Sequence, residues 1–307
     1  MPSPLLHYKI HEKLGEGGMG IIYLADDTKL KRKVALKFLP THVSVDPEER
    51  LRFKQEAQAA AALNHPNIAQ VYAIEEIEQE LFIVMEYVDG RELRKILDES
   101  ELTLEDKERI ALEIARGIQV AHDQGIIHRD IKSSNIMMDS AGRVKIMDFG
   151  LARIQGSEHI TKPGTTVGTT SYMAPEQLAG MEADRQSDIW SFGVVLYELF
   201  AGKLPFEGLY EPAIMYAITE EEPVPVSALN GEIPSPIEEV IEKCLRKKRE
   251  QRFNSFDEII NSLKVVSDNE TSPISGYYPP GQAAPRNRNA YLAGAAVLLL
   301  IVTAVFF

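Results

Sequence analysis

The stretch IIHRDIKSSNIMM, from Ile126 to Met138, places a group of polar side chains between two apolar pairs. An acid, two bases, an amide and an imidazole form this centre: Asp130, Arg129, Lys132, Asn135 and His128. A strand that only filled a core would not carry them, because a polar group costs free energy when it is buried without a partner. The stretch therefore predicts a polar loop, held between buried segments, that performs chemistry.

A glycine-rich stretch, LGEGGMGII, contains the pattern G-x-G-x-x-G at Gly15, Gly17 and Gly20. Alone the pattern is weak, because glycines are common in ordinary turns. A dinucleotide-binding fingerprint needs a helix directly after the glycines, whereas the sequence IIYLA that follows here is typical of a strand. The glycines therefore join two strands, which predicts a hairpin whose backbone N–H groups cover the phosphates of ATP.

Lys37 lies in the alternating stretch KVALKFLP, on the same face as Ala35. Ala35 leaves room for an adenine ring, and Lys37 is then placed to contact the α- and β-phosphates. A buried lysine needs a partner, and a helix predicted from Pro47 supplies Glu56 on its inward stripe. The alternative for both residues is a solvated surface charge. We expect Lys37 and Glu56 to pair.

The elements that must position these residues fall into two groups. The stretches HYKIHEKL, GIIYLADD and LFIVMEYV are typical of strands, and a helix with Asp46 as its N-cap should end before Pro66. From Leu104 to about Leu263 the pattern is mostly helical. The sequence predicts an α+β protein with a small strand-rich lobe and a larger helical lobe.

The amino-acid composition disfavours a nucleic-acid-binding protein and a protein held by disulfides or zinc. The chain has 307 residues, 44% of them hydrophobic, with a net charge of −13 and a pI of about 5.1. A nucleic-acid-binding protein is usually basic, so we expect no nucleic-acid partner. The single cysteine, Cys244, excludes an internal disulfide, and no Cys/His cluster has zinc spacing. A reducing, cytoplasmic location fits the main domain.

The C-terminal stretch 290–307, AYLAGAAVLLLIVTAVFF, carries no charge over 18 residues. As a helix it would be about 27 Å long, close to the roughly 30 Å of a bilayer core. We expect a transmembrane helix after a flexible linker at 266–289, with Arg286 and Arg288 holding the N-terminal side in the cytoplasm. The alternative is a buried C-terminal helix or an aggregation-prone tail. The N-terminus shows no cleavable signal peptide, and the chain is either tail-anchored or a fragment.

The motifs GEGGMG, VALK, HRDIKSSN, DFG and APE follow one another in the order typical of one family. From Tyr8 to about Leu263 the sequence resembles a eukaryotic-type, or Hanks-type, protein kinase. The stretches AAALNHPNIAQVY, VMEYVDG and GTTSYMAPEQL resemble the bacterial membrane-anchored serine/threonine kinases in particular. The resemblance implies a bilobal kinase domain at 8–265, with an N-lobe at about 8–85, a hinge at 86–88 and a C-lobe at about 89–265.

The resemblance also implies roles for individual residues. Asp130 would be the catalytic base, and Lys132 would neutralise the γ-phosphate; a lysine there points to serine or threonine substrates. Asn135 and Asp148 would hold Mg²⁺, with Mn²⁺ as an alternative metal. His128 would be structural. Lys37 and Glu56 count among the catalytic residues. The nucleotide-binding positions would be Leu14, Gly15, Glu16, Gly17, Gly18, Met19, Gly20, Ile22, Ala35, Lys37, Met85, Glu86, Val88 and Met137.

Further positions are carried over from the family. Asp188 would brace the catalytic loop, Thr169 would contact Asp130, and Glu176 would pair with Arg252, although RKKREQRF lacks the usual Asp-Pro. Arg129 would receive a phosphate on the activation segment. The candidate autophosphorylation sites are Ser157, Thr161, Thr165 and Thr166.

The expected function is transfer of the ATP γ-phosphate to protein serine or threonine hydroxyls by a single-pass membrane kinase. A homodimer that autophosphorylates in trans is compatible with the resemblance. A pseudokinase would need a broken motif, and Lys37, Glu56, Asp130, Asn135 and Asp148 are all present. A small-molecule kinase is disfavoured by the long activation segment that ends in APE, and a tyrosine kinase by Lys132 and Thr169.

Overall fold

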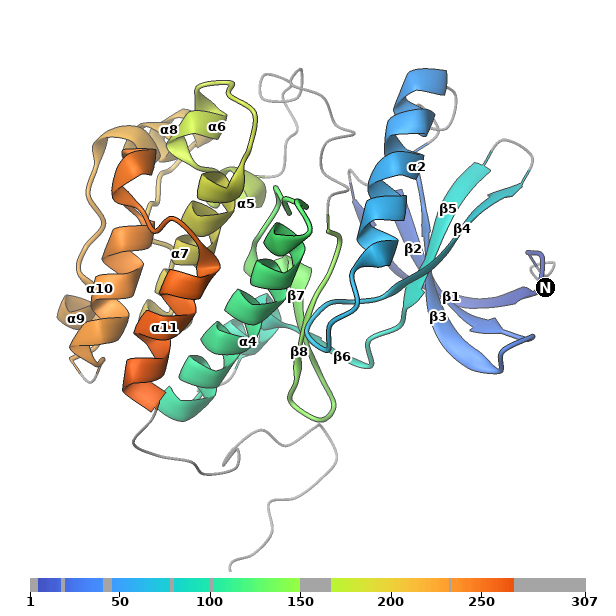
Figure 1. The fold of residues 1–307 in the computed structure, drawn as a ribbon, viewed down its shortest axis with the longest axis horizontal. Helices are drawn as coiled ribbons and strands as arrows, with labels where there is room; N and C mark the ends of the chain where they lie inside the picture. Colours follow the sequence, from blue (N-terminus) through green and yellow to red (C-terminus); the bar gives the residue numbers. More distant parts are fainter. Residues whose placement is uncertain are drawn as a thin grey trace, which may run out of the picture. The chain divides into compact units, whose positions relative to one another are not determined.

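The computed structural model describes residues 5–17, 20–40, 46–77, 80–99, 102–149, 167–231 and 233–267. The first lobe is an antiparallel sheet in the order β1-β2-β3-β5-β4, with helix α2 beside it (Figure 1). Its elements are β1 (Tyr8–Gly17), β2 (Gly20–Asp27), β3 (Arg32–Phe38), α2 (Pro47–Ala62), β4 (Val71–Ile77) and β5 (Glu80–Glu86). The strands agree with the stretches that the sequence predicted.

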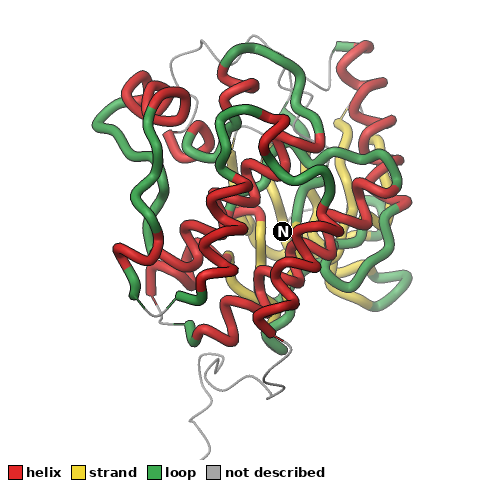
Figure 2. The backbone as a smooth tube through the Cα atoms, turned by 60° about the vertical axis from the view of Figure 1, so that its left-hand side comes forward, coloured by secondary structure: helices red, strands yellow, loops and turns green. Residues whose placement is uncertain are grey.

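The second lobe is mainly helical (Figure 2). A small sheet in the order β6-β7-β8 lies in it next to the first lobe. Its strands are β6 (Gly90–Glu92), β7 (Ile136–Asp139) and β8 (Val144–Ile146). The helices are α3 (Leu93–Glu99), α4 (Leu104–Asp123), α5 (Val167–Thr170), α6 (Pro175–Leu178), α7 (Arg185–Ala201), α8 (Glu211–Glu220), α9 (Val226–Leu229), α10 (Ser235–Cys244) and α11 (Phe256–Ser267), with 3₁₀ turns at Ser133–Asn135 and Arg249–Gln251.

Helix α7 forms the centre of this lobe. Its middle is apolar on every side, and Trp190, Phe192 and Leu196 are fully buried. A helix that is apolar all round has to be enclosed by other elements, and α4 and α10 pack against it. The buried helix gives the catalytic loop, which contacts its N-terminal turn, a rigid support.

The β3 strand divides the first lobe into two faces, as its alternation predicted. Val34 and Leu36 join a core with Tyr8, Phe82 and Val84. Ala35 and Lys37 lie on the opposite face and are also buried, at 4% and 3% exposure. Side chains alternate along a strand, so the residues expected at the nucleotide share the face that is turned away from this core.

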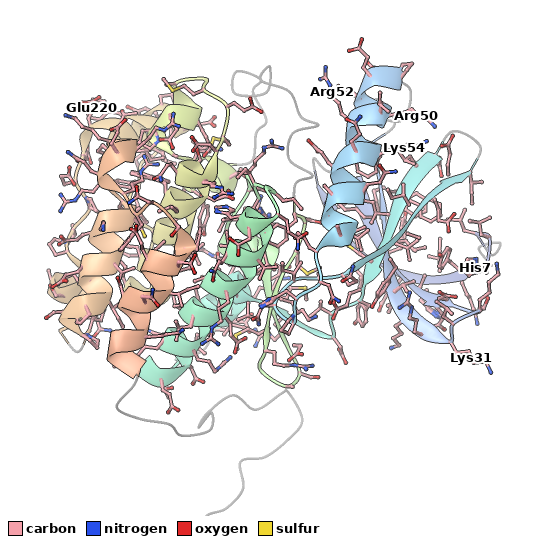
Figure 3. The ribbon with its side chains drawn as sticks, viewed as in Figure 1. His7, Lys31, Arg50, Arg52, Lys54 and Glu220 are labelled. Carbon is pink, nitrogen blue, oxygen red and sulfur yellow. The ribbon has the colours of Figure 1, made fainter. Side chains whose placement is uncertain are left out.

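Helix α2 begins as predicted. The Asp46 carboxylate accepts hydrogen bonds from the backbone N–H groups of Glu48 and Glu49, and Pro47 occupies the first turn. Arg50 and Lys54 project from the helix (Figure 3) and pair with Glu76 of β4 at 2.5 and 2.8 Å. These contacts help to set where α2 lies against the sheet.

Two expectations need comment. Ile126 and Ile127, expected as a buried segment before the catalytic loop, are half-buried and belong to no strand; Ile126 N–H donates to the backbone oxygen of Ala121 in α4. None of the helices within residues 5–267 that the structure describes is both long and apolar enough to cross a bilayer. The linker and the membrane span predicted after residue 265 lie outside the described residues.

Candidate active site

The catalytic loop brings three of the predicted residues together. Asp130 is 8% exposed, and its Oδ2 lies 2.8 Å from Nζ of Lys132. The Asn135 amide nitrogen donates to the backbone oxygen of Asp130 at 2.8 Å and to its Oδ2 at 2.9 Å. The amide nitrogen is thus used within the loop, which leaves the Asn135 oxygen as the group that a cation would take.

A buried carboxylate on α7 supports this loop. Asp188 is 1% exposed and accepts hydrogen bonds from the backbone N–H groups of His128 and Arg129, at 2.8 and 2.9 Å. The His122 ring, from the end of α4, lies 2.8 Å from the same carboxylate. The predicted brace is confirmed. His128 is fully buried with Nε2 2.9 Å from the oxygen of Met147, which fits its predicted structural role.

Lys37 is held against the second predicted metal ligand. Its Nζ lies 2.9 Å from Oδ2 of Asp148, and the two side chains are 4% and 14% exposed. Among the described residues, the other oxygen of Asp148, Oδ1, is buried without a hydrogen-bond partner. An unpartnered buried carboxylate oxygen is costly, and together with the Asn135 oxygen it offers hard ligands of the kind Mg²⁺ prefers. These residues fit a magnesium ion.

Glu56 lies close to Arg129 of the catalytic loop. Its Oε1 lies 3.4 Å from Nη1 of Arg129, and Nη2 of Arg129 lies 3.8 Å from Glu182. Lys37 forms an ion pair with Asp148. The sequence placed Glu56 correctly on the inward face of α2, next to buried Phe53, but spacing alone could not decide which cation it would meet.

The register of β2, β3 and β5 places several residues that are expected to contact the nucleotide on one face of the sheet. Ile22 is opposite Lys37, and Ala35 is opposite Met85, so the four share one face of the sheet. Gly20 has a φ of +110°, and a Cβ there would lie 1.8 Å from the backbone oxygen of Phe38. Glycine is therefore required at the base of the hairpin.

The other predicted nucleotide positions fall on three segments. The hairpin places Gly15, Glu16 and Gly17 opposite Ile22, Ile21 and Gly20. Leu14 is 44% exposed near the hairpin, Val88 is 6% exposed in the connection after β5, and Met137 is half-buried on β7. Gly18 and Met19 lie outside the described residues, as do the four candidate phosphorylation sites between 150 and 166.

A polar network beside the loop was missed by the sequence analysis. The Tyr172 hydroxyl donates to Glu198 at 2.6 Å and lies 2.9 Å from the Ser133 hydroxyl, and Arg94 donates to Glu198 at 2.7 Å. Burial, together with the Glu198 charge, raises the pKa of Tyr172 well above its usual range. One signal could have found it, because Glu198 is an acid within the apolar helix sequence VVLYELF.

Thr169 contacts the loop through Lys132. The Lys132 Nζ donates to Thr169 Oγ1 at 3.2 Å while it pairs with Asp130. Thr169 was expected to contact Asp130 directly, whereas in the structure Lys132 lies between the two side chains. Lys132 therefore ties the catalytic aspartate to the segment that follows residue 166.

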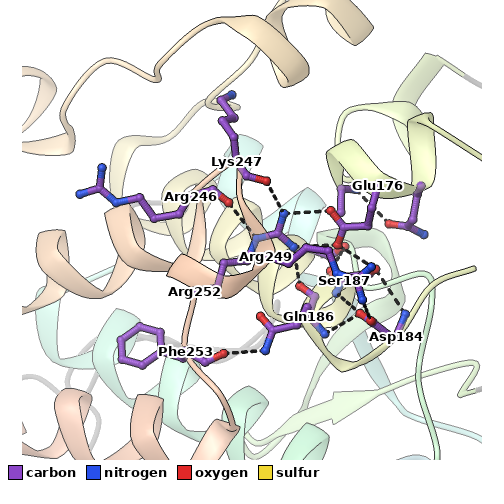
Figure 4. A network of polar contacts seen from close by, with 12 residues as sticks. Glu176, Asp184, Gln186, Ser187, Arg246, Lys247, Arg249, Arg252 and Phe253 are labelled. Atoms are coloured by element: carbon purple, nitrogen blue, oxygen red, sulfur yellow. Dashed lines mark hydrogen bonds and ion pairs between the residues drawn. The ribbon is translucent and has the colours of Figure 1, made fainter. Parts of the chain in front are cut away.

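The predicted pair of Glu176 and Arg252 is present and buried. Arg252 donates to the two carboxylate oxygens of Glu176 at 2.7 and 2.9 Å, and both residues are at most 5% exposed. Figure 4 shows the network around them, in which Ser187 donates to Glu176 and Arg252 also donates to the backbone oxygen of Gln186. The missing Asp-Pro before Arg252 does not prevent this pairing.

Comparisons with known proteins agree with this geometry. The protein kinase domain family matches residues 8–263. The serine/threonine-protein kinase PknB of Mycobacterium tuberculosis is 39% identical over 270 residues, which are 86% of this chain and 43% of that protein. The serine/threonine-protein kinase PksC of Streptomyces coelicolor is 38% identical over 280 residues, 87% of this chain and 50% of that protein.

The chain thus spans about half, or less, of the length of these relatives. Among solved structures, the PknI kinase domain of Mycobacterium tuberculosis superposes with a TM-score of 0.66 at 28% identity, and covers 84% of this chain and 96% of that domain. The two-lobed fold agrees with these matches. The chain belongs to the Hanks-type protein kinase family.

Proposed function

We propose that the protein is a serine/threonine protein kinase that transfers the γ-phosphate of ATP to protein hydroxyls. The observation that carries the proposal is the pairing of Asp130 with Lys132 beside the Lys37–Asp148 pair, at 2.8 and 2.9 Å. A base and three further charged groups meet between the lobes. That arrangement suits phosphoryl transfer, in which an enzyme mainly positions reactants and stabilises charge.

Each residue has a task in this proposal. Asp130 accepts the proton of the substrate hydroxyl as that oxygen attacks the γ-phosphate. Lys132, already bound to Asp130, neutralises charge on the phosphate in transit. Lys37 orients the α- and β-phosphates. Asp148 and Asn135 would hold Mg²⁺, which would supply additional positive charge for the transfer.

The preference for serine and threonine rests on two observations. Lys132 bridges Asp130 and Thr169, at 2.8 and 3.2 Å, and so occupies the space beside the catalytic base. The relatives PknB and PksC carry the name serine/threonine-protein kinase. ATP and protein hydroxyls are the proposed substrates, and no feature of the chain favours a nucleic acid.

Autophosphorylation of the activation segment is a further part of the proposal. Arg129 faces two acids, Glu56 and Glu182, at 3.4 and 3.8 Å. A phosphate on Thr161, Thr165 or Thr166 would compete with these acids for the Arg129 guanidinium. Transfer between two copies of the chain is the route we expect.

Membrane anchoring completes the proposed arrangement. The uncharged stretch 290–307 would cross the bilayer, the linker 266–289 would precede it, and the kinase domain at 8–265 would face the cytoplasm. Flotation of the full chain with anionic and neutral vesicles, compared with a chain ending at Pro285, tests this part. Equal flotation of the two would remove the anchor from the proposal.

The test of the activity uses the full chain in detergent with labelled ATP, Mg²⁺ and a generic protein substrate. We expect phosphoserine or phosphothreonine with the wild type. Lys37→Met and Asp130→Asn should each lower turnover by about a hundredfold or more, since each removes a charged group that acts on the reacting atoms. Nucleotide binding without any transfer would favour a pseudokinase, and phosphotyrosine would contradict the assigned specificity.

A further inference from the structure

We propose that Lys145 is a positioning residue for the nucleotide and acts through Glu86 at the hinge; this inference rests on the proposed function. Lys145 lies on β8 in the helical lobe, and its Nζ is 2.8 Å from Oε1 and 2.9 Å from Oε2 of Glu86. Glu86 is the last residue of β5 in the strand lobe. The ion pair therefore joins the lobes where the chain passes from one to the other.

The pair is shielded from solvent. The Lys145 and Glu86 side chains are 13% and 24% exposed. An exposed ion pair contributes little, whereas a shielded pair that is also hydrogen-bonded fixes geometry more firmly. Glu86 has such bonds, because its Oε2 accepts from Gln70 N–H at 3.1 Å and its own N–H donates to Gln70 O at 2.8 Å.

Lys145 projects from a fixed platform. On one side of it, Glu113 of α4 accepts the Val144 N–H at 2.8 Å, and the Asn67 side chain donates to Val144 O at 3.0 Å. On the other side, Ile146 N–H donates to Asn67 O at 2.8 Å, and Ile146 O accepts from Ala69 N–H at 2.9 Å. These hydrogen bonds hold the β8 backbone on both sides of Lys145. Replacing the Lys145 side chain should therefore leave the β8 backbone in place and change mainly the position of the Glu86 side chain.

The same short stretch of chain also holds the phosphate end of the site. Three residues after Lys145, Asp148 pairs with Lys37, and Met147 N–H donates to the backbone oxygen of Asn135 at 2.8 Å. Residues 145–148 therefore connect the hinge to the proposed metal ligands. The hinge backbone would bind adenine and Asp148 would bind the phosphates through a metal ion, so the Lys145–Glu86 pair sets the spacing between the two ends of the nucleotide.

If Lys145 positions the nucleotide, its loss should weaken nucleotide binding but leave the rate of phosphate transfer nearly unchanged. In the full chain, Lys145→Met should raise the KM for ATP about tenfold, as expected when a shielded charged hydrogen bond is lost. It should also weaken binding of a fluorescent ADP analogue about tenfold, measured by anisotropy. The kcat at saturating ATP should stay within about twofold, because Asp130 and Lys132 are untouched.

Two variants serve as matched comparisons. Lys145→Arg keeps the charge and should recover most of the affinity. Arg143→Met removes a cation from the same hairpin, but Arg143 is exposed and pairs with Asp139 at 2.7 Å, so ATP and ADP affinities should stay at the wild-type values. Because Lys145 acts through Glu86, adding Glu86→Gln to Lys145→Met should cause no further loss of affinity.

The inference is overturned if Lys145→Met lowers the melting temperature but leaves the ATP KM and the ADP affinity unchanged, since the pair would then be only structural. Equal effects of Arg143→Met and Lys145→Met would also overturn it, by pointing to general electrostatics. If Lys145→Met fails to fold, Glu86→Gln and Lys145→Arg carry the same comparison. A wild type that binds ADP but transfers no phosphate would refute the proposed function, while the ADP measurements would still test Lys145.

Discussion

Cys244 shows how burial at a single residue controls reactivity. The thiol is 0% exposed in the helical lobe, and burial raises its pKa far above the usual range. Thiolate is the reactive form, so a thiol reagent should modify the folded protein at least about a thousandfold more slowly than the unfolded chain, which a colorimetric thiol assay with and without denaturant can measure. Cys244→Ser provides the blank, and rapid modification of the native protein would contradict the burial.

The backbone conformation of two functional residues could not be predicted from the sequence. Arg129 and Asp148 have positive φ angles, +70° and +59°. Residues other than glycine seldom adopt this conformation, and it gathers at functional sites that the surrounding structure constrains. The motifs HRD and DFG identified both residues as functional. No propensity of arginine or aspartate indicates a left-handed backbone, because that conformation is imposed by contacts such as those of Asp188 and Lys37.

At the scale of elements, the N-cap of α2 offers a direct test. The Asp46 carboxylate accepts the Glu48 and Glu49 N–H groups at 2.8 and 3.3 Å. Asp46→Ala should lower the free energy of unfolding by about 1 kcal/mol, measured by urea denaturation, because two N–H groups lose their acceptor. Asp46→Asn keeps an acceptor oxygen and should lose less. Equal stability of the alanine variant and the wild type would show that the cap contributes nothing.

Local sequence patterns predicted the helices and strands better than they predicted which side chains of different elements would contact one another. Both the alternation around Lys37 and the N-cap at Asp46 were visible in the sequence. Which cation meets Glu56 depends on how α2 is placed against the second lobe, which no local pattern contains. The Lys145–Glu86 contact was missed for the same reason, since its partners are 59 residues apart.

At the scale of the whole molecule, the buried pair of Glu176 and Arg252 couples segments far apart in sequence. Burial raises the pKa of Glu176, but hydrogen bonds and charge from Arg252, with smaller help from Ser187, outweigh it, so the pKa lies below its usual value. A carboxyl whose pKa is lowered by folding adds stability above its unfolded pKa of about 4.3, and that stability is lost as the pH falls through the lower folded value.

Glu176→Gln should therefore destabilise the protein by about 3 kcal/mol at pH 7, because it leaves the Arg252 charge buried and unpaired. The difference between variant and wild type should shrink as the pH falls from about 4.3, where Glu176 of the unfolded chain takes up a proton, through the lower folded pKa, below which the folded carboxyl is neutral too. Urea unfolding at several pH values measures both effects. Glu250→Gln, at an exposed carboxylate near Arg252 in sequence, is the control and should change stability little. A pH-independent loss in Glu176→Gln would mean that the side chain acts through packing rather than through its charge.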